Sequence, residues 1–103
     1  MRKNTDEYLE DSQLRKEILR HLEESRYRLT RHADEELKKD DLDLKDILYI
    51  LKTGSHNKLK TQWNNRTQTW RYAIQGKTKE QKREARIIIA FVDEMLIITV
   101  MEI

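Results

Sequence analysis

The chain has 103 residues, of which 39% are charged and 37% hydrophobic, with two glycines, no proline and no cysteine. This length predicts a single domain over residues 1–103, and the lack of cysteine excludes disulfides, thiolate catalysis and cysteine-bound metal centres. No apolar run approaches the roughly 20 residues that cross a bilayer, and no apolar stretch follows the basic start. We therefore expect a cytoplasmic protein with no membrane partner and no secretory signal.

Three helices are predicted in the first half of the chain. Residues 8–24 repeat leucine and isoleucine every four positions among charged residues, which is typical of an amphipathic helix. Thr30 can cap a second helix that ends near Lys39. Asp43 can cap a third, whose apolar residues keep a helical spacing until Gly54 ends it.

Beyond Gly54 the pattern changes to one of strands, expected at roughly 57–63, 69–76, 85–92 and 95–102. The links between them are short, so neighbouring strands should be antiparallel. The predicted fold is therefore α+β, with three N-terminal helices packed on one face of a four-stranded antiparallel sheet.

A two-residue turn at Asp93-Glu94 would set the register of the last hairpin. The pairs on one face would be Val92 with Met95, Ala90 with Ile97, Ile88 with Thr99 and Arg86 with Met101. The other face would hold Ile87, Ile89, Phe91, Leu96, Ile98 and Val100, which are all apolar and should meet the helices. The first face mixes polar and apolar residues, which indicates a site or a partner surface.

The net charge of +2 is unevenly distributed. Residues 1–53 carry 12 basic and 14 acidic side chains, whereas residues 54–86 carry nine basic and two acidic ones. Such a basic segment attracts polyanions, although a merely solvated charged loop has the same composition.

His32 lies just inside the start of the second predicted helix, beside Arg31. The helix dipole there disfavours the imidazolium, so that a neutral base is available to move protons. A histidine that only packs or hydrogen-bonds at a helix start has the same signature. His32 and Glu36 have an i, i+4 ligand spacing, but no two histidines do, so no metal site and no cofactor is predicted.

The basic segment suits an RNA phosphodiester. Cleavage without a metal needs a proton acceptor for the 2′-hydroxyl, a proton donor for the leaving oxygen and cations over the phosphorane. The residues expected to bind phosphate are Lys60, Arg71, Tyr72 and Arg86, and further RNA contacts are expected from Arg31 and Lys58. Trp63, Trp70 and Tyr72 can stack on unpaired bases, or they can be the aromatic residues of an ordinary half-buried strand.

Several segments together resemble a small bacterial family of domains of unknown function. They are Arg26–Ala33, Asp43–Ile47, Gly54, Trp70–Gly76 and Leu96–Val100, and the resemblance covers roughly residues 12–103. That family is similar in architecture to the RelE, BrnT and MqsR mRNA-interferase toxins, with a RelE/barnase-like arrangement of helices on a small sheet. The resemblance places His32, Gly54, Tyr72, Gly76 and Thr99 at characteristic positions.

We therefore predict a metal-independent endoribonuclease, the toxin of a toxin–antitoxin pair, whose partners are RNA and an antitoxin protein. Its catalytic residues would be His32, Arg71, Tyr72, Arg86 and Thr99. The acidic first half departs from the more basic toxins. The alternative is a non-catalytic interaction module that binds a protein partner, or a second copy of itself, through the half-polar sheet face.

Overall fold

The computed structural model describes residues 7–103 and has an α+β fold. The helices are α1 (Asp11–Glu23), α2 (Arg31–Lys39) and α3 (Leu44–Thr53), with a 3-10 turn η1 (Lys58–Lys60). The strands are β1 (Tyr27–Leu29), β2 (Ser55–His56), β3 (Gln62–Asn64), β4 (Thr69–Lys77), β5 (Glu84–Val92) and β6 (Glu94–Glu102). The predicted class and the three N-terminal helices are confirmed, but the sheet has six strands and not four.

The sheet order is β1-β6-β5-β4-β2. The remaining strand, β3, also pairs with β4, but with its first residues, whereas β2 pairs nearer its end. All pairings are antiparallel except β1 with β6, which is parallel, so the expectation of a purely antiparallel sheet was wrong at that edge. The predicted strand 57–63 is also interrupted. The Asn57 side chain accepts a hydrogen bond from the Lys60 amide (3.2 Å), which stabilises the 3-10 turn between β2 and β3.

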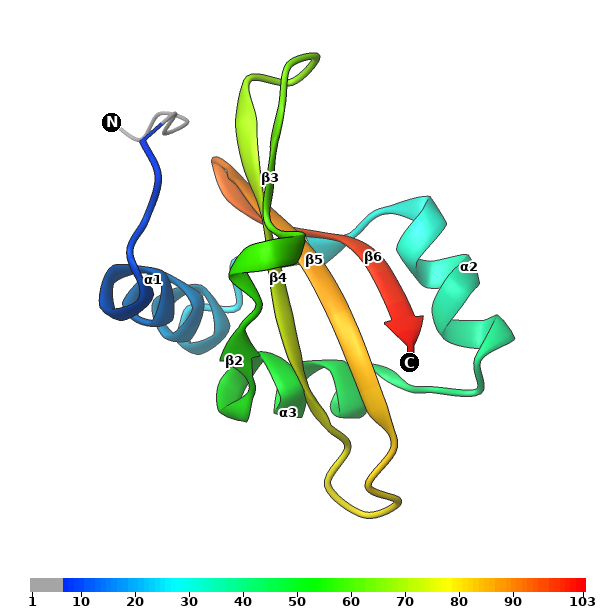
Figure 1. The fold of residues 1–103 in the computed structure, drawn as a ribbon. Coiled ribbons are helices and arrows are strands. Elements are labelled where there is room, and N and C mark those ends of the chain that lie inside the picture. Colours follow the sequence, from blue (N-terminus) through cyan, green and yellow to red (C-terminus); the bar gives the residue numbers. More distant parts are fainter. Residues whose placement is uncertain (1–6) are drawn as a thin grey trace.

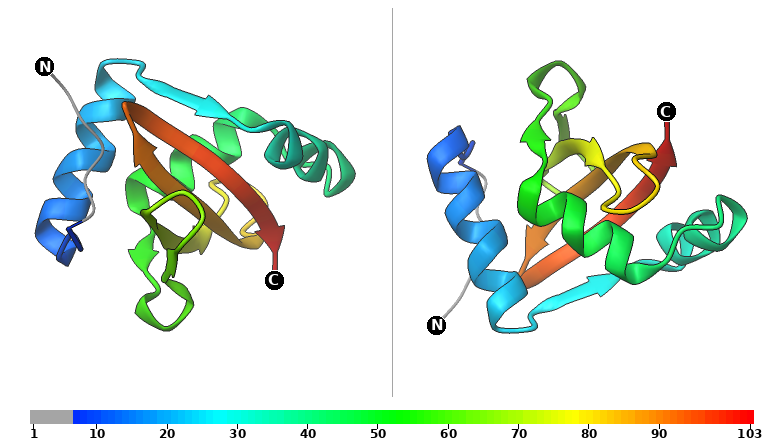
Figure 2. Two further views of the ribbon diagram at one scale, coloured as in Figure 1. Left: turned by 90° about the horizontal axis from the view of Figure 1, so that it is seen from above. Right: turned by 90° about the horizontal axis from the view of Figure 1, so that it is seen from below.

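The helices cover one face of the sheet and one of its edges. In Figure 1, α3 passes behind β4 and β5, whereas η1 crosses in front of β4. Figure 2 shows α1 and α2 at opposite ends of the molecule, with α2 beside β6. Along this edge the Val100 amide donates to Glu36 Oε1 (2.9 Å) and the Glu102 amide to Asp40 Oδ2 (3.4 Å). Side chains of α2 and of its C-cap residue thus satisfy amides that an uncovered edge strand would expose.

The predicted helix ends are confirmed by their hydrogen bonds. The Thr30 hydroxyl accepts from the Ala33 amide at 3.1 Å, and Asp43 forms a reciprocal capping box with Asp46. Gly54 does end α3, although its φ of −75° is open to any residue. A glycine is needed there because a Cβ atom would lie 2.6 Å from the Gln75 carbonyl oxygen.

The core lies between the sheet and the helices. The sheet contributes Tyr72, Ile74, Ile87, Ile89, Phe91, Met95, Ile97 and Val100, and the helices contribute Leu14, Ile18, Ala33, Leu37, Ile47, Ile50 and Leu51. No helix within residues 7–103 is long and apolar enough to cross a membrane.

The register of the β5–β6 hairpin differs from the prediction near its turn. Asp93 alone, with φ of 63°, separates Val92 from its partner Glu94, so the two-residue turn was wrong. An irregularity between Ile88 and Ile89 then shifts the pairing by one residue. The expected pairs Ile88 with Thr99 and Arg86 with Met101 are therefore confirmed, whereas Val92 with Met95 and Ala90 with Ile97 are wrong. As a consequence Met95 and Ile97 are buried in place of Leu96 and Ile98.

Candidate functional site

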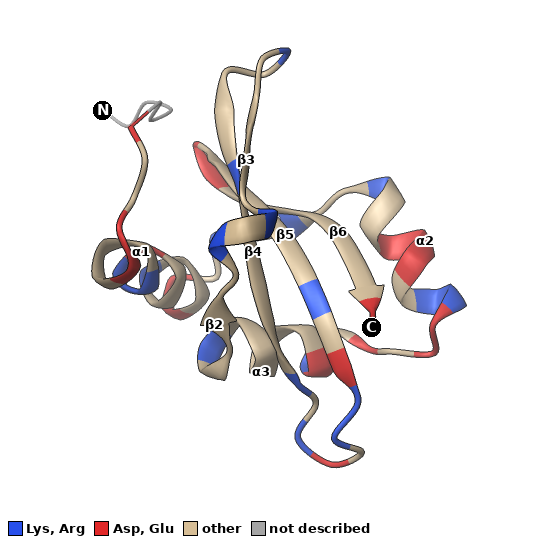
Figure 3. Ribbon diagram, in the orientation of Figure 1, with Lys and Arg blue, Asp and Glu red and all other residues tan. Residues whose placement is uncertain are grey.

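One face of the sheet carries no α-helix, and only the short 3-10 turn η1 crosses it, at β4 (Figure 1). Residues on this side alternate with the buried core residues of β4, β5 and β6. We call it the open face and define it by Arg71, Gln75, Arg86, Ile88, Leu96, Thr99 and Met101. Figure 3 shows basic positions on η1 and in the middle of β5, whereas α2 has acidic positions in its middle and basic ones at both ends. Polar and apolar side chains share this face, as predicted for the Arg86 and Thr99 row.

Arg86 sits between two neutral neighbours on the open face. Its Nε donates to Gln75 Oε1 at 3.3 Å, and its Nη1 lies 3.7 Å from Met101 Sδ. Gln75 is itself held by Asn57, whose Nδ2 donates to the same oxygen at 2.9 Å. Within residues 7–103 no carboxylate lies at ion-pair distance from Arg86. Its guanidinium is therefore positioned without being neutralised, and can bind an anion.

Arg71 lies on the same face but at a distance from Arg86. Gln75 pairs with Arg86, and Arg71 is four residues from Gln75 along β4, which corresponds to about 13 Å. The Arg71 Nε is buried without a hydrogen-bond partner, and no carboxylate of the described chain pairs with this side chain. The two arginines thus suit different phosphates of one chain better than a single phosphate.

Glu36 connects His32 to the open face. One carboxylate oxygen, Oε1, accepts from the Val100 amide at 2.9 Å, and the other, Oε2, lies 3.3 Å from His32 Nε2. The imidazole therefore lies beside the segment of β6 that contains Thr99. The His32 side chain is 63% exposed, so a substrate can reach it.

Thr99 and Arg86 are diagonal neighbours on the open face. Thr99 pairs with Ile88 and Arg86 with Met101, which places such a diagonal pair about 7–8 Å apart. Of the predicted catalytic residues, His32 thus lies at the edge of β6 near Thr99, whereas Arg86 lies one strand further in, on β5, and contacts Gln75 of β4. Sequence reasoning did not assign Glu36 and Gln75 to this site, although the i, i+4 spacing of His32 and Glu36 was visible.

The remaining predicted cations flank the open face. Lys60 lies on η1 and has no carboxylate partner among residues 7–103, whereas Lys58 Nζ is 3.5 Å from Asp11. Arg31 lies at the start of α2, with its side chain 94% exposed and 3.6 Å from Glu35. Lys58 and Lys60 lie near the β4 edge of the sheet and Arg31 lies near the β6 edge, so the structure does not bring these three cations together.

The predicted aromatic residues lie on the helix-covered side. Tyr72 is 1% exposed, and its hydroxyl accepts a hydrogen bond from the Leu9 amide at 2.8 Å. Burial raises the pKa of Tyr72, so this phenol stays protonated. Trp70 packs against Trp63 and Tyr8, with ring centroids 5.5 and 4.9 Å away. The structure thus separates Tyr72, Trp63 and Trp70 from Arg71 and Arg86, as in an ordinary half-buried strand.

A histidine outside the predicted site also has a carboxylate partner. His56 Nδ1 lies 2.9 Å from Asp11 Oδ1, and its Nε2 lies 2.8 Å from the Thr61 hydroxyl. This order of groups resembles a nucleophile triad. However, the Thr61 hydroxyl also accepts from the Ala73 amide and bonds the Asn57 carbonyl, both at 3.1 Å. All its bonding capacity is used within the fold, so we assign this chain of contacts to structure.

No three His, Cys, Asp or Glu side chains form a group that could hold a metal ion within residues 7–103. The comparisons add one finding about the sequence. A family model described as "Domain of unknown function (DUF4258)" matches residues 29–102, which include α2, α3 and β2 to β6 but not α1. No curated protein and no solved structure matches the chain.

Proposed function

The chain belongs to the family described as Domain of unknown function (DUF4258), and we propose that its open face binds single-stranded RNA and cleaves it without a metal ion. The observation that carries this proposal is the position of Glu36, whose carboxylate contacts both His32 and the backbone of β6 beside Thr99. A proton-transfer group is thereby held at the edge of the open face, on which Arg86 supplies a cation that no described carboxylate neutralises.

The residues have separate tasks in this proposal. With its Nε2 proton facing Glu36, His32 has a lone pair on Nδ1 that accepts the proton of the 2′-hydroxyl. The 2′-oxygen attacks the phosphorus, the bond to the 5′-oxygen breaks, and water protonates that leaving oxygen. Arg86 and the Thr99 hydroxyl donate to the phosphate oxygens on which negative charge develops.

Arg71 and Lys60 extend the site along the RNA. Both lie on the β4 side of Arg86, and Arg71 is about 13 Å along the strand from the residue that pairs with Arg86, so they suit further phosphates on one side of the one that is cleaved. We also propose a toxin role, in the cytoplasm, with a small acidic protein as the neutralising partner.

Cleavage of an unstructured RNA of about 30 nucleotides, in the presence of EDTA, tests the proposal. The wild-type protein should release fragments with 2′,3′-cyclic phosphate ends, and the matching DNA, which has no 2′-hydroxyl, should stay intact. His32→Ala should lower the rate by roughly 10²–10⁴ with little change in RNA affinity or melting temperature.

Glu36→Gln has a matched control in Glu35→Gln, because Glu35 is exposed on the same helix. A glutamine at position 36 retains an oxygen for the Val100 amide but loses the charge beside His32, so the rate should fall while the fold persists. Glu35→Gln should cleave as the wild type does. Equal rates for all variants, or an RNA that stays intact with the wild type, would contradict the nuclease proposal.

A second candidate function is favoured by the apolar part of the open face. Ile88 and Leu96 are half-buried there, Met101 is 39% exposed, and Leu59 on η1 is 93% exposed. Apolar residues grouped on a surface are typical of protein interfaces. A protein that dimerises, leaves RNA intact and becomes monomeric on Met101→Glu would support a non-catalytic interaction module.

A further inference from the structure

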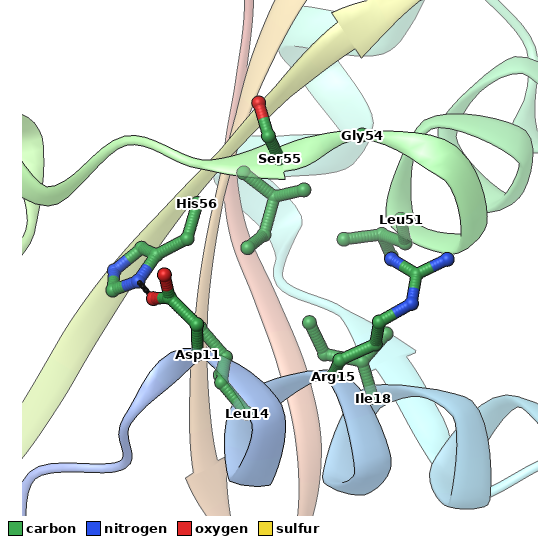
Figure 4. Close-up of a pocket in the computed structure, with 9 residues that line it drawn as sticks. Asp11, Leu14, Arg15, Ile18, Leu51, Gly54, Ser55 and His56 are labelled. Carbon is green, nitrogen blue, oxygen red and sulfur yellow. Dashed lines mark hydrogen bonds and ion pairs between the residues drawn. The ribbon is translucent and has the colours of Figure 1, made fainter.

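One edge of the sheet ends in β1, and the described chain does not cover it. In both views of Figure 2, β1 forms the outer margin of the molecule between α1 and α2. The helix α1 begins near the other edge, where Asp11 turns towards His56 of β2 (Figure 4), and approaches β1 only where it ends at Glu23. The outer side of β1 is therefore accessible to another chain.

The hydrogen bonds between β1 and β6 establish which backbone groups point outwards. The Arg26 carbonyl accepts from a β6 amide at 3.0 Å, and the Thr30 amide donates to a β6 carbonyl at 2.9 Å. In a parallel ladder with this register, the N–H and C=O groups of Arg28 also face β6. Those of Tyr27 and Leu29 point away from the sheet, and within residues 7–103 they have no hydrogen-bond partner. They can bond to a further strand.

The side chains of β1 and of the residue before it alternate in chemistry. Arg26 and Arg28 are exposed, and Arg28 pairs with Leu96, so both arginines lie on the side of the open face. Tyr27 and Leu29 are half-buried and pack against the core on the other side. A strand added beside β1 would therefore have every second side chain next to an arginine and the others next to apolar residues.

Both arginines keep donors for a ligand. Arg26 Nη2 donates to the Asp93 carbonyl at 2.9 Å, and no carboxylate of residues 7–103 pairs with this side chain. Arg28 Nε lies 3.0 Å from a Glu94 oxygen, but 63% of the arginine side chain is exposed, and exposed ion pairs contribute little. Each guanidinium can therefore also bind a carboxylate from another chain.

We propose that the β1 edge binds an extended segment of another protein, in which acidic and apolar residues alternate. This segment would add a strand to the sheet by bonding to the outward groups of Tyr27 and Leu29. Its carboxylates would contact Arg26 and Arg28, and its apolar side chains would lie beside Tyr27 and Leu29. A second copy of this chain is disfavoured, because antiparallel pairing of two β1 strands would place arginines beside arginines. The proposal does not depend on the RNA cleavage proposed for the open face.

A peptide of about seven residues that alternates glutamate with valine tests this proposal on the full chain. When the peptide binds, amide hydrogen exchange measured by NMR should slow at Tyr27 and Leu29 and stay unchanged at Arg28, whose amide already bonds to β6. A peptide that alternates lysine with valine should not bind. The fully N-methylated glutamate–valine peptide cannot donate hydrogen bonds to the strand and should not bind either.

Substitutions at the arginines separate recognition by β1 from general attraction between charges. Arg28→Gln should weaken binding of the glutamate–valine peptide about threefold, and the double variant Arg26→Gln/Arg28→Gln should weaken it about tenfold. Lys38→Gln is the matched control, because Lys38 also pairs with an exposed carboxylate but lies on α2. This control should bind the peptide as the wild type does, and all variants should keep the melting temperature of the wild type.

Several results would overturn the proposal. Absence of peptide binding, or binding that leaves the Tyr27 and Leu29 amides unprotected, would exclude an added strand. Equal binding of the glutamate and lysine peptides would exclude recognition by the arginines. Protection of both amides that rises with protein concentration, in the absence of peptide, would assign the β1 edge to a second copy of this chain.

Discussion

The two faces of the sheet are built from the same strands but differ in what they contact. On β4, Tyr72 is 1% exposed beneath the helices, whereas its neighbour Arg71 lies on the open face with no carboxylate partner in the described chain. On β5, Ile87 and Ile89 are buried, whereas Arg86 and Ile88 alternate with them. Alternate residues of a strand thus have different roles: the buried ones pack against the helices, and those on the open face are available for binding. Substitutions at neighbouring positions should therefore have opposite consequences.

The largest difference is expected between Ile89→Asp and Ile88→Asp. Ile89 is 0% exposed in the core, so an aspartate there buries an unpaired charge, at a cost comparable to the whole stability of about 5–15 kcal/mol. Ile88 lies on the open face, and the same substitution should cost only about 1 kcal/mol. Thermal unfolding followed by circular dichroism measures both. Similar melting temperatures for the two variants would refute the assignment of faces.

A smaller loss of stability is expected at the contact between α3 and β4. In Gly54→Ala the new methyl group would lie 2.6 Å from the Gln75 carbonyl oxygen and 2.7 Å from that of Ile50. Both atoms belong to the backbone and cannot rotate away, so we expect a destabilisation of about 1–3 kcal/mol in urea unfolding. Ser55→Ala, at the exposed next position, is the control and should stay within about 0.5 kcal/mol of the wild type.

On the open face we expect an effect on binding without an effect on stability. Arg86→Gln should reduce the salt dependence of RNA affinity by about 0.7 in a plot of log affinity against log salt concentration, the value for one phosphate contact on a single strand. The melting temperature should not change, since the contacts of Arg86 are with the neutral Gln75 and Met101.

Arg66→Gln is the matched control for that measurement. Arg66 belongs to the basic segment but lies exposed in the turn between β3 and β4, away from the open face. If Arg66→Gln and Arg86→Gln change the slope equally, then net charge alone attracts the RNA and the open face is not its site.

The features that sequence predicted correctly are local ones. Thr30 and Asp43 cap helices because their side chains reach amides three residues away. The alternation in β4 and β5 likewise indicated which residues share a face. It also implied that Tyr72 and Arg71 point apart, although both were assigned to one site from their residue types and from a family resemblance.

Other features depend on contacts between distant segments. The positive φ of Asp93 and the irregularity beside Ile88 set the β6 register, and no residue type in the hairpin requires either of them. The role of Glu36 is similar. Its spacing from His32 was visible, but its bond to the Val100 amide depends on α2 lying along β6. The pairing of Asp11 with His56 joins residues 45 positions apart, so no local pattern indicates it.

The smallest effect is expected for the contact between Asp11 and His56, which joins α1 to β2. The hydrogen bond from His56 lowers the pKa of Asp11, and the Lys58 charge acts in the same direction. A carboxyl whose pKa is lower in the folded state stabilises the fold above its unfolded pKa of about 3.9, and this contribution is lost as the pH falls through the folded value. The melting temperature of Asp11→Asn should therefore be below that of the wild type at pH 7, and this difference should narrow below about pH 4.

Glu35→Gln also removes one carboxylate charge, from the exposed side of α2, and is the control. A gap for Asp11→Asn that stays constant down to pH 3 would show that its charge does not hold α1 in place.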